Sequence, residues 1–175
     1  MGISQALEID TTYLGTVHHS RYQTREKNIE AIVLHQTHGN NGISELEGWK
    51  KESTFKSAEF LIDKDGMIYQ TLDYKKYFAY HSGITKECEP FVKTIRDGGA
   101  DGLHSTDRNN FVLNDNSIGI EMVGYTGSEL TSAQLESLKK LTNHLVQRNG
   151  LSSEEVFAHP WISCKHPSEA TGFTD

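Results

Sequence analysis

Short, mostly apolar runs recur along the chain, and they constrain its fold more than any other feature. Four of them cover residues 29–34, 58–63, 117–124 and 155–158, and turn or polar residues flank them. Runs of this length, rich in β-branched residues, are typical of buried strands. Helical patterns lie between some of them. This order predicts an α/β fold: a single domain with a central mixed twisted β-sheet flanked by helices.

The second run predicts a hairpin. Residues 58–63 and 67–70 flank an Asp-Gly pair at Asp65 and Gly66. Two apolar runs around Asp-Gly are a strong short-range signal for paired antiparallel strands.

A long amphipathic helix is predicted to begin after Thr131. Thr131 and Gln134 have the spacing of a capping box, and Gly150 is suited to end the helix. Its apolar stripe comprises Leu135, Leu138, Leu141, Leu145 and Val146. A shorter helix is expected over residues 43–53, where apolar residues recur at helical spacing.

The length of 175 residues fits one domain. Residues 1–28 are polar and irregular, which suggests an N-terminal arm over the surface, and the main domain would cover residues 29–175. Residues 84–116 lack periodicity, and a loop of this length in a compact domain is usually functional.

Charge and hydropathy exclude several functions. The chain has 17 Lys and Arg against 24 Asp and Glu, a net charge of -7, so it would repel phosphates and we expect no nucleic-acid partner. No apolar run approaches the ~20 residues of a membrane helix, so no membrane insertion is expected. The N-terminus has no basic start or apolar stretch of a signal peptide. We expect a cytoplasmic protein as synthesised, which would reach a substrate outside the cytoplasm by another route.

Two histidines occupy equivalent positions. His35 and His159 each follow a short buried run. If the two strands are neighbours, both imidazoles emerge at one edge of the sheet and can share a metal ion. The alternative is that each histidine ends its strand and hydrogen-bonds to the backbone.

Four segments together resemble the zinc-dependent N-acetylmuramoyl-L-alanine amidases of peptidoglycan, which include peptidoglycan-recognition proteins and short phage amidases. They are residues 32–37, the hairpin region 57–70, the Ser-Ile-Gly-Ile-Glu strand within 114–121, and 158–165. The resemblance implies a hydrolase that cleaves the amide bond between N-acetylmuramic acid and L-alanine. It also implies Zn²⁺ as the cofactor, peptidoglycan or a muropeptide as the substrate, and residues 29–175 as the catalytic domain. We expect a monomer. Lysis by an endolysin, wall recycling and an antibacterial toxin all remain open as cellular roles.

The resemblance also assigns roles to individual residues. It implies that His35 and His159 bind zinc and that Glu121 is the general base or its electrostatic partner. Some subfamilies use a Tyr on the hairpin strand, where this chain has Ala58, and others carry a Glu where this chain has Glu121. Lys165 resembles the family's lysine that stabilises the oxyanion, although a solvated surface lysine is the alternative.

Substrate contacts are expected from Thr37, Tyr80 and His81. Thr37 ends the first matching segment, and Tyr80 and His81 resemble an aromatic-His-small-Gly turn that lines the family's substrate groove. An ordinary turn with an incidental histidine is the alternative reading of this pair.

The third zinc ligand departs from the family pattern. Family members end the last segment with a ligating Asp or Cys. Counting forward from Lys165 places Pro167 in the ligand position, counting back from Gly172 places Ala170 there, and neither can bind a metal ion. We assign the ligand to the adjacent Glu169, with His166 and Cys164 as alternatives. A His-His-carboxylate set is a known catalytic zinc site. A second departure is Glu59, where the family commonly has His, and we expect it to alter the polarity of the groove.

Two competing functions remain. The same fold without catalysis would be a peptidoglycan-binding recognition module, and the altered ligand segment keeps this alternative open. A zinc hydrolase acting on another amide is the second. Metal content separates the zinc enzymes from the recognition module, because a protein that only binds peptidoglycan needs no zinc.

Overall fold

The computed structural model describes residues 6–53, 56–81 and 114–162. The main elements follow in the order β1 (Tyr22–Thr24), β2 (Ala31–Gln36), α1 (Gly42–Trp49), β3 (Phe60–Ile62), β4 (Ile68–Gln70), β5 (Tyr77–Ala79), β6 (Ser117–Met122), α3 (Ser132–Asn149), β7 (Val156–Ala158) and α4 (His159–Ile162). Short 3-10 turns precede β1, β6 and β7: η1 (His19–Arg21), η4 (Asn114–Asn116) and η5 (Ser153–Glu155).

Five strands form the central sheet in the order β4-β3-β6-β2-β7. β6 is parallel to β2 and β3, β7 is parallel to β2, and β4 is antiparallel to β3. The predicted mixed sheet is therefore confirmed. The parallel strands β2 and β6 are buried along their whole length, as expected for strands covered on both faces.

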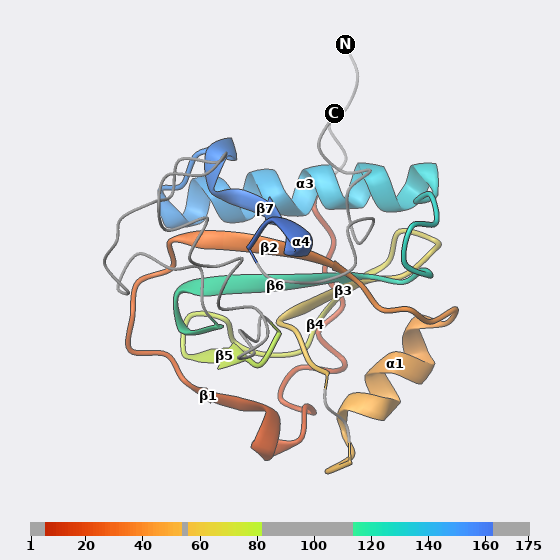
Figure 1. Ribbon diagram of the computed structural model, residues 1–175, viewed down its shortest axis with the longest axis horizontal. Helices are drawn as coiled ribbons and strands as arrows, with labels where there is room; N and C mark the ends of the chain where they lie inside the picture. Colours follow the sequence, from red (N-terminus) through yellow and green to blue (C-terminus); the bar gives the residue numbers. More distant parts are fainter. Residues whose placement is uncertain (1–5, 54–55, 82–113, 163–175) are drawn as a thin grey trace.

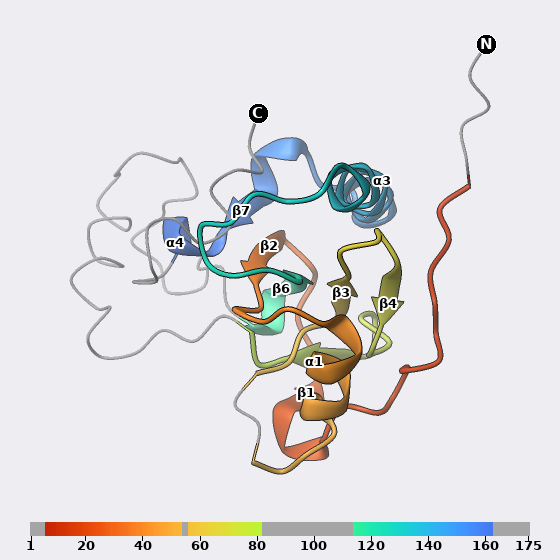
Figure 2. The ribbon, with the colours of Figure 1, turned by 90° about the vertical axis from the view of Figure 1, so that its right-hand side faces the viewer.

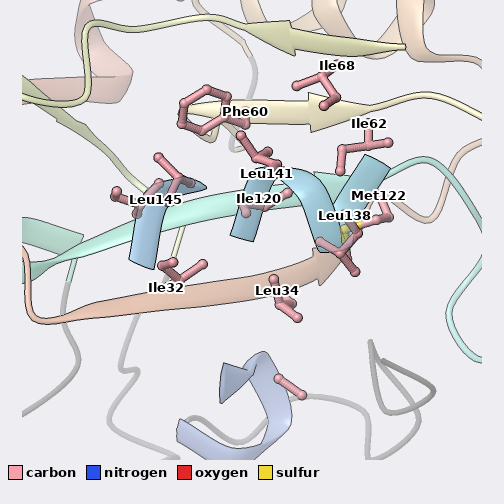
Figure 3. Close-up of a cluster of buried hydrophobic side chains, with 12 residues drawn as sticks. Ile32, Leu34, Phe60, Ile62, Ile68, Ile120, Met122, Leu138, Leu141 and Leu145 are labelled. Atoms are coloured by element: carbon pink, nitrogen blue, oxygen red, sulfur yellow. The ribbon is translucent and has the colours of Figure 1, made fainter. Parts of the chain in front are cut away.

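Helix α3 covers one face of this sheet (Figures 1 and 2). Its side chains meet the strands in one apolar cluster (Figure 3). The cluster consists of Ile32, Leu34, Phe60, Ile62, Ile68, Ile118, Ile120, Met122, Leu138, Leu141, Leu145 and Ala158. The burial of these side chains fixes which residues of β2 and β6 point toward α3, and hence which point away.

The ends of α3 agree with the sequence. Thr131 and Gln134 form the reciprocal capping box, and Gly150 ends the helix in the left-handed conformation with φ 67°. One expectation about its face is wrong. Leu135 is 44% exposed, whereas Gln134 is buried and donates a hydrogen bond to the Val123 carbonyl at 2.9 Å. The apolar stripe begins one turn later, at Leu138.

Helix α1 lies on the opposite side of the sheet (Figure 2). Leu46 and Trp49 pack there with Leu61 and Val123 in a second apolar cluster. Asn41 caps its start by accepting a hydrogen bond from the Ser44 N–H at 2.9 Å. The helix ends at Trp49, earlier than the expected residue 53.

The predicted hairpin is present as β3 and β4. Gly66 adopts φ 87°, and its N–H donates to the Asp63 carbonyl at 2.9 Å. A positive φ of this size suits glycine because a Cβ would be strained there.

Within the predicted N-terminal arm, parts of residues 6–28 pack against the rest of the domain. Val17 is buried in the second cluster, and β1 pairs with β5 in a separate two-stranded antiparallel sheet. The strand sequence Tyr-Gln-Thr has no apolar alternation, and it pairs with a strand far along the chain. Its strand conformation therefore depends on long-range contacts rather than on a local pattern.

No helix within the described ranges has both the length and the apolar character needed to cross a bilayer.

Candidate active site

Three parallel strands bring polar side chains to one place. His35 lies directly opposite Glu121 in the register of β2 and β6, and Ala158 of β7 lies opposite Leu34. Because Leu34 faces α3, the alternation along a strand turns His35 and its partner Glu121 toward the other face. His159 follows β7 immediately as the first residue of α4.

His35 differs slightly from its expected position. It is the fifth residue of β2 rather than the first residue after a strand, because β2 runs from Ala31 to Gln36. The condition under which the two histidines would meet is fulfilled, because β2 and β7 are neighbouring strands.

The imidazoles are in direct contact. The Nδ1 atoms of His35 and His159 are 2.7 Å apart, and His35 Nε2 is 3.1 Å from His81 Nδ1. All three rings are at least nine-tenths buried. Burial is the main reason that the pKa of His81 is held well below its usual range, and the nearby His35 and His159 add to this effect. His81 is therefore neutral at physiological pH.

A pocket of about 200 Å³ opens onto these groups. Its lining includes the three histidines and Glu121, which is only 7% exposed. The remaining lining residues are Gln36, His38, Lys56, Ser57, Tyr80 and Thr126.

The donor set fits zinc in part. Two imidazoles that direct their Nδ1 atoms at one another offer two of the three protein ligands that a catalytic zinc takes. Within the described ranges, no group of three or more His, Cys, Asp and Glu is arranged to hold a metal ion. The expected third ligand Glu169, its alternatives Cys164 and His166, and the expected oxyanion residue Lys165 lie outside the described residues.

The expected substrate-binding residues have different surroundings. Tyr80 lines the pocket, and so does His81, although the ring of His81 also contacts His35 and Ser117. Thr37 is buried beside the pocket rather than on its wall, and its Oγ1 accepts the N–H groups of Gly39 and Gly124 at 3.1 and 3.3 Å. Their contact with substrate stays a prediction.

Glu59 does not alter the polarity of the groove, contrary to expectation. Its side chain is fully buried and absent from the pocket wall. Its carboxylate accepts the N–H groups of Ala79 and Gly119 at 2.8 and 2.7 Å, and Arg25 lies 3.3 Å away. Burial raises the pKa of Glu59 to about 7, while Arg25 and the two N–H groups act in the opposite direction.

Arg25 is the counterpart of Glu59 and was not expected from the sequence. Its guanidinium is buried and donates to the carbonyls of Tyr74, Asp115 and Ser117 at 2.9, 2.7 and 2.8 Å. The pair thus ties the segment after β1 to β5 and β6. A single Arg in a polar segment carries no local signal of such burial.

Two pocket residues also escaped sequence reasoning. His38 adopts φ 58°, an uncommon conformation for a non-glycine residue, and its ring meets Tyr125 edge-on at 5.5 Å. Lys56 donates to the Thr37 carbonyl at 2.7 Å. His38 directly follows the segment 32–37, and Lys56 directly precedes the segment 57–70. Their closeness in sequence to these two segments could have indicated that they line the pocket.

The fold and the pocket define an α/β protein with two histidines and one carboxylate at the carboxyl-terminal edge of its parallel strands. The sequence profile described as N-acetylmuramoyl-L-alanine amidase matches residues 25–171. The chain therefore belongs to the N-acetylmuramoyl-L-alanine amidase family.

Solved structures share this fold at low sequence identity. A mutant endolysin from Bacillus subtilis is 19% identical with a TM-score of 0.61, and the match covers 90% of this chain and 86% of that one. The endolysin N-acetylmuramoyl-L-alanine amidase LysCS from Clostridium intestinale is 18% identical with a TM-score of 0.55, covering 95% and 89%. A selenomethionine derivative of AmpD is 22% identical with a TM-score of 0.59, covering 94% and 90%. No curated protein matches the chain.

Proposed function

We propose that this protein is a zinc-dependent peptidoglycan hydrolase that cleaves the amide bond between N-acetylmuramic acid and L-alanine of the stem peptide. One observation carries the proposal: His35 and His159 meet through their Nδ1 atoms at 2.7 Å, and Glu121 lies opposite His35 in the strand register. Family membership and the endolysin and amidase names of the similar structures support the same substrate class.

His35 and His159 would hold the zinc ion, together with Glu169. When bound, zinc supplies Lewis-acid chemistry, which polarises a carbonyl and lowers the pKa of water. The two imidazoles suit this task because they are buried, close to one another and close to a carboxylate.

Glu121 is the group placed to move a proton. It lines the pocket and lies beside His35 on the neighbouring strand. We assign to its carboxylate the proton of the water that attacks the lactyl carbonyl, and this proton then passes to the leaving amine of L-alanine. General base catalysis requires the carboxylate to lie within hydrogen-bond reach of the reacting water.

Two further groups complete the proposed site. Lys165 is assigned to the oxyanion that develops on the scissile carbonyl, since a cation aimed at developing charge stabilises the transition state. Tyr80 on the pocket wall is assigned to the substrate.

The test combines metal content with catalysis. Purified protein is analysed for zinc by mass spectrometry, and release of stem peptide from peptidoglycan is measured with and without a chelator. We expect one zinc per chain and release that the chelator abolishes and added zinc restores. His35→Ala is the matched variant and should lose both.

Retained wall binding without zinc and without peptide release would overturn the proposal. It would instead establish a non-catalytic recognition module. The loss of activity would then be explained by the altered segment that carries the third zinc ligand in the family. Zinc-dependent hydrolysis of small acyl amides, without release from peptidoglycan, would indicate a hydrolase of another amide.

A further inference from the structure

The imidazole of His81 is held by specific contacts, and the proposed mechanism assigns it no role. It lies between His35 and the start of β6. Its Nδ1 is 3.1 Å from His35 Nε2, and its Nε2 is 3.3 Å from Ser117 Oγ. The His81 ring meets the His35 ring edge-on, with centroids 5.2 Å apart and planes at 80°.

Gly119 makes this position possible. A Cβ at residue 119 would lie 2.5 Å from Cγ and 2.9 Å from Nδ1 of His81, closer than real Cβ contacts allow. Any other residue at this point of β6 would displace the imidazole. The backbone of His81 is held as well, because its N–H donates to Asn114 Oδ1 at 2.9 Å.

The surroundings of the His81 ring favour a proton on Nε2. Nε2 faces oxygen atoms: Ser117 Oγ at 3.3 Å and the carboxylate of Glu59 at 3.9 Å. A proton on Nε2 satisfies this side of the ring, and it leaves Nδ1 with a lone pair. Nδ1 is the atom that faces His35.

The tautomer of His81 in turn fixes the tautomer of His35. If Nδ1 of His81 accepts, then Nε2 of His35 must carry the donated proton, and Nδ1 of His35 is left as the nitrogen with the lone pair. That Nδ1 atom is the one 2.7 Å from His159 Nδ1, where the proposed zinc ion is held. Metal-binding histidines characteristically donate their other N–H to a partner that fixes the tautomer.

We propose that His81 is a positioning residue that accepts the Nε2–H of His35 and so holds His35 in the tautomer whose Nδ1 can bind a metal ion. This inference rests on the zinc site of the proposed function. It assigns His81 a task on the protein side of the pocket rather than a contact with substrate.

The experiment first reads the tautomer in metal-free protein. Nitrogen-15 NMR of the imidazoles, with His35 assigned by comparison with His35→Asn, should show the proton of His35 on Nε2 in the wild-type chain. A proton on Nδ1 of His35 in the wild type would overturn the proposal without any variant of His81.

Two substitutions then separate hydrogen bonding from packing. His81→Leu fills similar space without an acceptor, whereas Oδ1 in His81→Asn can replace Nδ1 as the acceptor. We expect zinc affinity, measured by chelator competition, to fall about 10- to 100-fold in His81→Leu. It should return to within about threefold of wild type in His81→Asn. The exposed His19→Leu is the matched control and should bind zinc as the wild type does.

Equal loss in His81→Leu and His81→Asn, or wild-type affinity in His81→Leu, would contradict the positioning role. Gly119→Ala provides an independent arm if His81→Leu does not fold, because it displaces the same ring and should also weaken zinc binding. If the wild type binds no zinc, the proposed metal dependence fails, and the tautomer of His35 alone decides whether His81 positions it.

Discussion

Two carboxylates lie close to the pocket, and their surroundings separate their roles. Glu121 lines the pocket beside His35. Glu59 is fully buried, does not line the pocket, and accepts backbone N–H groups. A carboxylate that meets the pocket can reach a substrate water, and one that holds strands together cannot. The position of Glu121 leads to a prediction about catalysis, and the burial of Glu59 leads to a prediction about stability.

Substituting Glu121→Gln should abolish proton transfer and preserve the fold. The amide keeps the shape of the side chain but cannot act as a base, so we expect peptide release to fall by about 10²–10⁴-fold. Zinc content should stay at the wild-type value. The matched control is Glu136→Gln on the exposed surface of α3. Wild-type hydrolysis by Glu121→Gln would contradict its role as the base.

Glu59 should make stability depend on pH. Its pKa is about 7 in the folded state against an ordinary value of 4.5, so the folded state binds the proton more tightly. The free energy of unfolding therefore falls as pH rises between these two values. We expect the wild type to lose roughly 2–3 kcal/mol relative to Glu59→Gln between pH 5 and pH 8.

Urea denaturation of both proteins across this pH range measures the difference. The exposed Glu129→Gln serves as the control and should follow the wild type closely. A stability difference that stays constant, or that grows in favour of the wild type with rising pH, would contradict the raised pKa.

At the scale of elements, α3 shows how a helix face is selected. Leu138, Leu141 and Leu145 contact the sheet, and Leu135, which has the same residue type and belongs to the same sequence stripe, does not. The difference arises because Gln134 at the start of the helix turns inward and bonds to the Val123 carbonyl. The N-terminal turn of α3 is therefore attached to the sheet by polar contacts.

Alanine substitutions on this helix should separate the two leucine environments. Leu141→Ala removes a fully buried side chain and should lower the free energy of unfolding by about 2–5 kcal/mol. Leu135→Ala should change it by less than about 0.5 kcal/mol, as exposed positions do. Urea denaturation measures both. Similar losses in the two variants would mean that Leu135 belongs to the core.

At the scale of the whole molecule, the site joins parts of the chain that are far apart. His159 is 124 residues beyond His35, and the two meet only because β7 pairs with β2. A ligand held by both residues therefore stabilises the folded chain as a unit.

Zinc should raise thermal stability for this reason. A ligand that binds only the folded state adds about 2.7 kcal/mol when its free concentration is 100 times Kd. We expect the Tm to fall when zinc is removed by a chelator and to recover when it is restored. His35→Ala should show no such shift, and an equal shift in that variant would place the zinc elsewhere.

The sequence by itself determined the features that depend on neighbouring residues. The Asp-Gly turn, the capping box at Thr131 and the glycine end at Gly150 are local chemistry, and the structure contains all of them. The buried strands were also visible, because apolar β-branched runs have few alternatives in an α/β domain. These elements sufficed to predict the mixed sheet, whereas the meeting of His35 with His159 depended on which strands are neighbours.

Only the tertiary structure decided the contacts that depend on strand order and register. The pairing of His35 with Glu121, the burial of Arg25 against Glu59 and the place of His81 over Gly119 each join segments separated by more than 30 residues. No local pattern encodes such a contact, because the energy that selects it comes from desolvation and packing in the finished fold. The register of β2, β6 and β7 thus turns widely separated polar residues into one pocket.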